Sequence, residues 1–290
     1  MLTDADLPAL WADLGVPGAI DIHTHFLPEP VMRSVWEYFD QAGANYGIRW
    51  PIEYRWDDRA RLEHLRAMGV KRFTALVYAH KPGMAAWLSE WALDFAAGVP
   101  DCLPTATLFP EPGVTDYVGR ALERGALVFK VHLQVSDFDP RDPLLDPVWG
   151  MLADARAVVV IHCGSAPLPG RFTGPGPIGA VARRFPDLRL VIAHLGAGEF
   201  EDFLDMTQER PHTWLDTTMA LTDFMQDLRP FPAGRLPQLR GLSEQGRVLF
   251  GSDFPNIPYP FAHQVQALLD HGLDMAQTVW HAPHQLFAAV

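Results

Sequence analysis

The chain has 290 residues, enough for one large domain or two small ones, and its 48% hydrophobic and 20% charged residues are typical of a globular protein. A net charge of −12 disfavours binding to nucleic acid or to an anionic membrane, because like charges repel. We expect no membrane span, since no apolar run reaches roughly 20 residues, and no signal peptide at the start of the sequence. Cys102 and Cys163 lie in separate apolar segments, so a disulfide is not expected and a cytoplasmic location is.

Short apolar runs rich in β-branched residues recur along the chain, each followed by a turn and an amphipathic segment. The runs span residues 18–25, 70–79, 102–109, 126–133, 157–163, 188–195, 212–217 and 247–253. Helices are predicted between them at 57–68, 83–97, 114–123, 144–155, 179–185 and 199–208. Near-continuous apolar runs of this kind are typical of parallel strands that are covered on both faces.

Eight strands alternating with helices predict an α/β fold, a closed (β/α)8 TIM barrel that occupies residues 1–290 as a single domain. An open doubly wound sheet is the alternative, but it normally carries a glycine-rich phosphate loop after its first strand. Here that turn reads His-Phe-Leu-Pro. The connections 26–56 and 219–237 are unusually long, and such connections usually form lids or walls of a binding site.

Polar residues recur at the predicted carboxyl ends of the strands, where the active sites of β/α barrels lie. His23 and His25 end the first strand and should point the same way, because side chains alternate along a strand. The fifth and sixth strands end in His162 and His194, and the eighth ends in Asp253. A lone histidine at such a place is more often structural than a ligand. Four histidines and an aspartate at these ends together indicate a metal site.

The order His-x-His, His, His, Asp, with the flanking segments 21–28 (DIHTHFLP), 193–196 (AHLG) and 251–255 (GSDFP), resembles the amidohydrolase superfamily. More narrowly it is similar to the amidohydrolase-related group that contains aminocarboxymuconate semialdehyde decarboxylase and the pyrone dicarboxylate lactonases. The resemblance covers essentially the whole chain. Its combined motif is specific for the superfamily but not for the reaction.

The resemblance implies that His23, His25, His162 and Asp253 hold one divalent ion. We expect zinc, with manganese or cobalt as alternatives, because nitrogen and carboxylate ligands discriminate poorly between these ions. His194 then lies beside the metal-bound water as a catalytic residue rather than a ligand. Asp253 has a second role, since it can accept the proton of that water, whose pKa the ion lowers toward about 7.

Lys130 and His132, on the fourth strand, should share the inward face. Superfamily members with two metal ions use a carbamylated lysine at the end of this strand, so Lys130 could bridge a second ion. We favour a simpler role, in which Lys130 and His132 bind a substrate carboxylate or oxyanion. A lysine that only neutralises the acidic metal centre is the third alternative.

Other positions are weaker candidates. His80 and Glu111 could line the pocket or be solvated in loops. Asp216 could hold a neighbouring ligand from behind. Arg171 could meet an acidic substrate, although a plain surface arginine is the simpler reading. The chain also departs from the group near its end, where Pro283 falls inside the predicted last helix and should interrupt its hydrogen bonds.

Three functions remain open at this point. The first is hydrolysis, in which metal-bound hydroxide attacks an amide, lactone or ester of a small, carboxylated substrate. The second is non-oxidative decarboxylation with the same ligands; its aromatic-acid branch often has Glu in place of the first histidine of His-x-His, so His23 argues mildly against it. A binding protein without catalysis is the third, and the five retained site positions argue against it. The partners expected are a small-molecule substrate and, as an option, a second copy of the chain.

Overall fold

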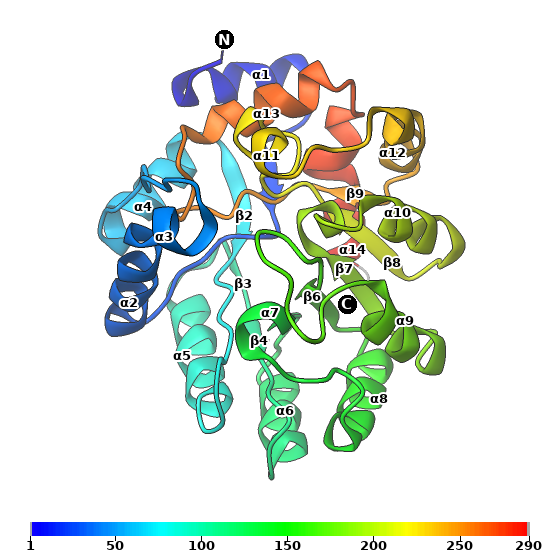
Figure 1. Ribbon diagram of the computed structural model, residues 1–290. Coiled ribbons are helices and arrows are strands. Elements are labelled where there is room, and N and C mark those ends of the chain that lie inside the picture. Colours follow the sequence, from blue (N-terminus) through cyan, green and yellow to red (C-terminus); the bar gives the residue numbers. More distant parts are fainter. Residues whose placement is uncertain (1, 289–290) are drawn as a thin grey trace.

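Parallel strands form the centre of the computed structural model, which describes residues 2–288. Figure 1 shows these strands with the helices around them. The strands are β1 (Ala19–Asp21), β2 (Val70–Thr74), β3 (Cys102–Leu103), β4 (Thr105–Thr107), β5 (Val128–His132), β6 (Val158–His162), β7 (Arg189–Ile192), β8 (Thr213–Asp216) and β9 (Val248–Leu249).

The strands close into a barrel in sequence order. β1 to β3 pair in one sheet and β4 to β9 in another. β3 and β4 are two parts of one strand that is interrupted at Pro104, which has no N–H to continue the ladder. The last strand returns to the first: the amide of Ile22 donates to the carbonyl of Phe250 at 3.1 Å, and Thr24 forms a parallel bridge with Phe254. The predicted (β/α)8 barrel is therefore confirmed, and the open sheet is wrong.

The helices lie on the outside of the barrel and cover most of the expected segments. They are α1 (Leu7–Asp13), α2 (Glu29–Asp40), α3 (Ala42–Tyr46), α4 (Asp58–Ala67), α5 (Ala85–Gly98), α6 (Val114–Glu123), α7 (Leu133–Ser136), α8 (Asp146–Asp154), α9 (Pro175–Arg184), α10 (Phe200–Glu209), α11 (Asp223–Leu228), α12 (Leu236–Glu244), α13 (Phe261–Asp270) and α14 (Ala282–Ala288). None of the helices in residues 2–288 is both long and apolar enough to cross a bilayer.

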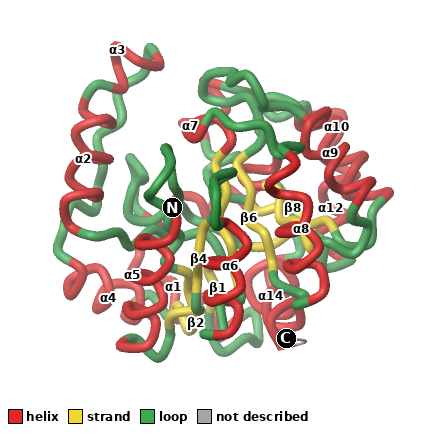
Figure 2. The backbone as a smooth tube through the Cα atoms, turned by 90° about the horizontal axis from the view of Figure 1, so that it is seen from below, coloured by secondary structure: helices red, strands yellow, loops and turns green. Residues whose placement is uncertain are grey.

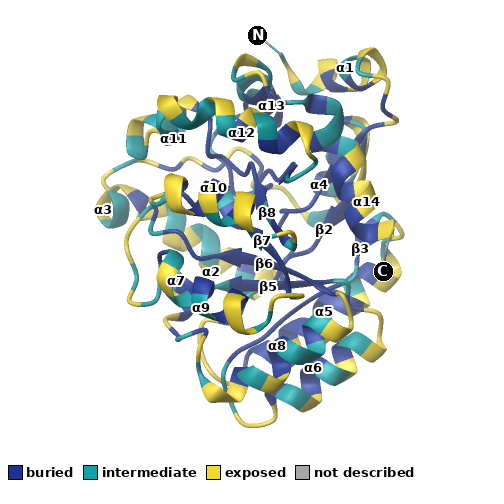
Figure 3. Cartoon of the chain, turned by 90° about the vertical axis from the view of Figure 1, so that its right-hand side faces the viewer, coloured by how far each residue is buried: buried dark blue, intermediate teal, exposed yellow. Residues whose placement is uncertain are grey.

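Two layers of apolar side chains fill the barrel and its surroundings. Alternate strand residues such as Val128, Val158 and Val160 form the inner layer, while Phe129 and Val159 pack outward with residues of the helices. This alternation is the period of two that strand geometry imposes. Figure 3 shows that the strands are mostly buried and that exposure lies mainly on the outer faces of helices and in loops, although Lys71 and Arg72 of β2 are exposed.

The two long connections are partly helical rather than open loops. Residues 26–56 contain α2 and α3, which stand apart from the ring of helices (Figure 2). Residues 219–237 contain α11, a short 3-10 turn and the start of α12.

The chain also accommodates Pro283 near its end. A π-helical turn, Gln277–His281, precedes α14, so Pro283 becomes the second residue of a new helix, where no intrahelical N–H bond is lost. Leu286 and Phe287 of this helix join the inner apolar layer. The expected interruption is thus present as a change of helix type, and the packing under the barrel is kept.

Candidate active site

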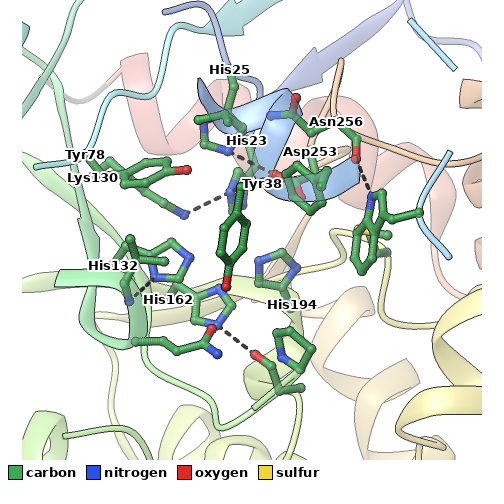
Figure 4. Close-up of a pocket in the computed structure, with 18 of the residues that line it drawn as sticks. His23, His25, Tyr38, Tyr78, Lys130, His132, His162, His194, Asp253 and Asn256 are labelled. Atoms are coloured by element: carbon green, nitrogen blue, oxygen red, sulfur yellow. Dashed lines mark hydrogen bonds and ion pairs between the residues drawn. The ribbon is translucent and has the colours of Figure 1, made fainter. Parts of the chain in front are cut away.

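Three predicted ligands come together at the carboxyl ends of β1 and β9. The ligand atoms of His23, His25 and Asp253 all lie within 4.8 Å of one another. The Nε2 atom of His25 is 2.9 Å from Oδ1 of Asp253, and that of His23 is 3.6 Å from the same oxygen. Burial raises the pKa of Asp253, but the hydrogen bond and charge interaction with His25 outweigh it and hold the pKa well below its usual range. Asp253 is therefore an ionised carboxylate between two imidazoles (Figure 4).

The far nitrogen of each imidazole is fixed by a buried acceptor. Nδ1 of His23 donates to Oδ2 of Asp216 at 2.8 Å, and Nδ1 of His25 donates to the carbonyl of Leu76 at 2.8 Å. The lone pair of His23 Nε2 is the one that a metal ion would use, and an ion bound at Nε2 of His25 would replace its contact with Asp253. Histidines that ligate metal ions are oriented in this way, by a carboxylate or a carbonyl on the other nitrogen. The donor set thus fits a divalent metal ion, and Asp216 lies behind His23, a predicted ligand.

Lys130 reaches the same cluster from β5. Its ammonium donates to Nε2 of His23 at 2.9 Å, on the side where a metal ion would bind. Burial lowers the pKa of Lys130 to about 8, and the nearby carboxylates of Asp216 and Asp253 oppose that shift. Burial, followed by the charge of Lys130, lowers the pKa of His23 to about 3, so the ring of His23 is neutral and able to ligate.

His162 lies near the cluster but is turned toward a neighbouring loop. Its Nε2 atom donates to the carbonyl of Ala166 at 2.9 Å, which leaves Nδ1 as its free acceptor. It stacks on His132 with the ring centroids 4.0 Å apart and the planes 11° from parallel. Burial lowers the pKa of both rings well below the usual value. The role of His162 as a fourth ligand remains a prediction, because its side chain is not among the three that converge.

His194 stands between the two groups of histidines. Its ring centroid is 5.2 Å from that of His23 and 4.8 Å from that of His162. Nδ1 donates to the carbonyl of Thr218 at 3.1 Å. Burial lowers its pKa, so the ring is neutral and Nε2 is left without a proton. His194 is therefore placed as an acceptor beside the predicted ligands.

Both His194 and Asp253 lie in turns that follow a strand rather than in the strands expected to carry them. β7 ends at Ile192, and β9 ends at Leu249. His194 has φ of 57° and Asp253 has φ of 66°, in the left-handed region. Gly251 makes the second turn possible, since a Cβ at this position would lie 2.7 Å from Cβ of His23.

A cavity of about 580 Å³ opens above these residues, within the range of small-molecule sites. Of the weaker candidates, His80 lines it. Glu111 instead accepts from the amide of Gly83 at 2.5 Å, and Arg171 is exposed with its guanidinium 4.9 Å from the ring of Phe172.

Sequence reasoning missed much of the cavity lining, and Tyr78 and Asn256 are two polar examples near the histidines. The ring centroid of Tyr78 is 5.8 Å from that of His25. Tyr78 lies two residues after Leu76, which faces inward, so the alternation of side chains places Tyr78 on the same face. Alternation along the second strand could have identified it. Asn256 lies three residues beyond Asp253 and bonds two tryptophans of the segment 26–56. No pattern in the sequence marks Asn256 out.

The model of the amidohydrolase family matches residues 20–282. The chain belongs to the amidohydrolase family. No curated protein sequence matches this family member.

Solved structures share its fold at low sequence identity. An uncharacterized TIM-barrel protein from Bordetella bronchiseptica is 17% identical, with a TM-score of 0.74 over 93% of this chain and 98% of that one. A putative 2-pyrone-4,6-dicarboxylic acid hydrolase from Pseudomonas putida is 18% identical, with a TM-score of 0.61 over 94% and 98%. A 5-carboxyvanillate decarboxylase from Sphingomonas paucimobilis is 14% identical, with a TM-score of 0.61 over 94% and 99%.

Proposed function

We propose that this amidohydrolase is a metal-dependent hydrolase that cleaves an amide, lactone or ester of a small, carboxylated molecule. The observation that carries the proposal is the state of His194. Its Nδ1 proton is held by the Thr218 carbonyl and its buried ring is neutral, so Nε2 is an acceptor in the cavity. An acceptor at this place can orient a water molecule and take its proton, which is what hydrolysis requires.

We assign the metal ion to His23, His25 and Asp253, with His162 as the remaining ligand. A divalent ion, zinc first and manganese or cobalt as alternatives, would supply Lewis acidity and an acidified water molecule when bound. Asp253 can hold a proton on the carboxylate oxygen that does not face His25. His194 then passes a proton between water and the leaving group at its Nε2 atom.

Lys130 and His132 are proposed to bind the substrate. The Lys130 ammonium is the only side-chain cation, besides any protonated histidine, among the cavity-lining residues in the described part of the chain. It can donate a charge-assisted hydrogen bond to a carboxylate or a developing oxyanion. His132 accepts from the amide of Val135 at Nδ1, 3.3 Å away, so its Nε2 atom carries the proton and is a second donor.

Non-oxidative decarboxylation is the second candidate, and the burial of Lys130 favours it. A buried ammonium beside the ligands can hold the carboxylate that is lost, and one structural neighbour is named as a decarboxylase. The two reactions differ in the fate of water. Hydrolysis adds a water oxygen to the product, whereas decarboxylation releases carbon dioxide and adds only a proton.

The test is a turnover assay of the metal-loaded enzyme in water enriched with the oxygen-18 isotope. A panel of carboxylated lactones, aryl amides, esters and aromatic carboxylates is followed by mass spectrometry and by carbon dioxide release. We expect label in the new carboxyl group and no carbon dioxide. Carbon dioxide release from a panel member without label in the product would replace the hydrolase assignment with the decarboxylase. Loss of turnover after chelation and its return with zinc are the matched controls.

A further inference from the structure

The cavity has two unlike sides. The polar side is the histidine cluster at the strand ends. The opposite side is formed by α2, α3 and the segment after them, through Tyr38, Phe39, Tyr46 and Trp50, which we call the aromatic wall. The rings of the wall pack against one another: the ring centroids of Phe39 and Trp50 are 5.1 Å apart, and those of Tyr38 and Tyr46 are 5.9 Å apart. These spacings are those of interacting aromatic pairs.

The wall is held in place next to the ligand loop. Nε1 of Trp50 donates to the carbonyl of Asn256 at 2.7 Å, and Nε1 of Trp36 donates to its side-chain oxygen at 3.1 Å. The amide of Asn256 in turn donates to the carbonyl of Asp253 at 2.8 Å. One hydrogen bond from the wall, and a second from Trp36 on the same helix as Tyr38, therefore attach this side of the cavity to the loop of a predicted metal ligand.

Internal packing of residues 26–56 explains the position of Trp50 but not that of Tyr38. Trp50 is buried at 8% exposure, as expected of an aromatic residue that secures a long connection. Tyr38, by contrast, is 50% exposed although it lines the cavity. Its side chain points into the cavity in Figure 4. An exposed aromatic ring in this position is available to a ligand.

The charges of the cavity limit the ligand further. Among the lining residues within 2–288, Lys130 and Asp253 are the only lysine, arginine, aspartate or glutamate side chains. The Lys130 ammonium is already bonded to His23. The proposed metal ion and Lys130 both lie on the histidine side of the cavity, so a carboxylate placed against the aromatic wall would meet no cation, and an unpaired buried ion costs several kcal/mol.

We propose that the substrate joins an apolar aromatic body to its reactive carbonyl group, with any carboxylate confined to the histidine side of the cavity. The aromatic body stacks on the wall, with Met219 and Met225 on other parts of the cavity surface as adaptable apolar contacts. The reactive group and any carboxylate face the histidines and Lys130. This inference rests on the proposed function of the same site.

The experiment is a calorimetric binding series with the zinc-loaded protein and four probes: acetate, benzoate, naphthoate and glutarate. We expect naphthoate to bind at least about tenfold more tightly than acetate or glutarate, because each additional ring buries apolar surface. Glutarate, a flexible dicarboxylate without a ring, tests the charge argument. Glutarate binding as tightly as naphthoate would overturn the inference.

Variants place the aromatic body on the wall. Tyr38→Ala should weaken naphthoate binding at least about fivefold and leave acetate binding and metal content unchanged. Trp87→Ala removes a ring that is 44% exposed and outside the cavity lining, and it should change neither affinity. Circular dichroism checks that both variants fold. Naphthoate binding that is unaffected by Tyr38→Ala would also overturn the inference.

The binding series and the turnover assay can give independent results, so they distinguish this inference from the proposed function. Tight naphthoate binding together with carbon dioxide release would keep this inference and replace hydrolysis by decarboxylation. Hydrolysis of compact dicarboxylates, with weak naphthoate binding, would keep the proposed function and reject the aromatic substrate.

Discussion

Replacing Asp216 by asparagine should weaken metal binding without removing any ligand. The Asp216 carboxylate accepts three hydrogen bonds, from Nδ1 of His23 and from the amides of His194 and Thr218, at 2.8, 2.8 and 3.1 Å. An amide of the same shape has one acceptor oxygen and an NH2 group. If the NH2 group faces His23, the ring proton must move to Nε2, and the lone pair needed for the metal is lost. If it faces the backbone, two buried amides lose their acceptor.

The expected size follows from these two outcomes. Loss of an oriented partner behind a ligand typically costs 10–100-fold in metal affinity, or about 1.4–2.8 kcal/mol. An unsatisfied buried amide costs about 1–3 kcal/mol of unfolding free energy. Zinc affinity is measured by competition with a chromophoric chelator, and stability by urea unfolding of the metal-free protein. Asp223→Asn is the control, since its carboxylate is 81% exposed and should leave both values unchanged. A folded Asp216→Asn protein with zinc affinity within about twofold of the parent would refute the assignment of His23 as a ligand.

Further changes test the other members of the site and the stability of the fold. His162→Ala should lower metal content and abolish turnover, and full metal content in this variant would remove His162 from the ligand set. His194→Asn should keep most of the metal but lose about 10²–10⁴ in kcat, as expected of a proton-transfer residue; metal loss in step with activity would make it a ligand. Lys130→Met should raise KM or lower kcat and leave one metal ion bound. A carbamylated Lys130 that bridges two ions predicts otherwise: the parent enzyme would bind two ions per chain, the substitution would halve that number, and bicarbonate would reactivate parent enzyme depleted of carbon dioxide. Burial raises the pKa of Asp4, but the hydrogen bond from His64 outweighs it and leaves the pKa lowered, so its ionised form stabilises the fold above about pH 4 and this contribution is lost as the pH falls further. Asp4→Asn should therefore cost about 1 kcal/mol in urea unfolding at pH 6 and less at pH 3; an equal loss at both would contradict this.

Much of the barrel could be predicted because local patterns determine it. The helix expected at 114–123 has the observed bounds, and α4 begins after Asp57, which accepts from the amide of Ala60 at 2.8 Å. Alternation along a strand placed Lys130 on the inward face and Phe129 on the outward one. These properties depend on neighbours a few residues away, which the sequence shows directly.

The rest of the site depends on contacts between distant residues. The bond between His23 and Asp216 joins positions 193 apart in sequence, and the bond between Trp50 and Asn256 spans 206 residues. The orientation of His162 toward Ala166 is set by a loop whose path no periodic pattern describes. Sequence could name candidates at these places but could not give their partners.

One buried carboxylate connects the parts of the site that the sequence treats as separate. Asp216, at the end of β8, orients the His23 ring from β1 and holds the backbone of His194 after β7. That backbone has a left-handed conformation, which costs a non-glycine residue of the order of 1–3 kcal/mol and persists only where surrounding contacts fix it. The same group therefore sets both the tautomer of a predicted ligand and the position of the predicted proton acceptor. Geometry at the two positions is coupled, so a change at Asp216 should reach metal affinity and proton transfer together, although it touches neither metal nor substrate.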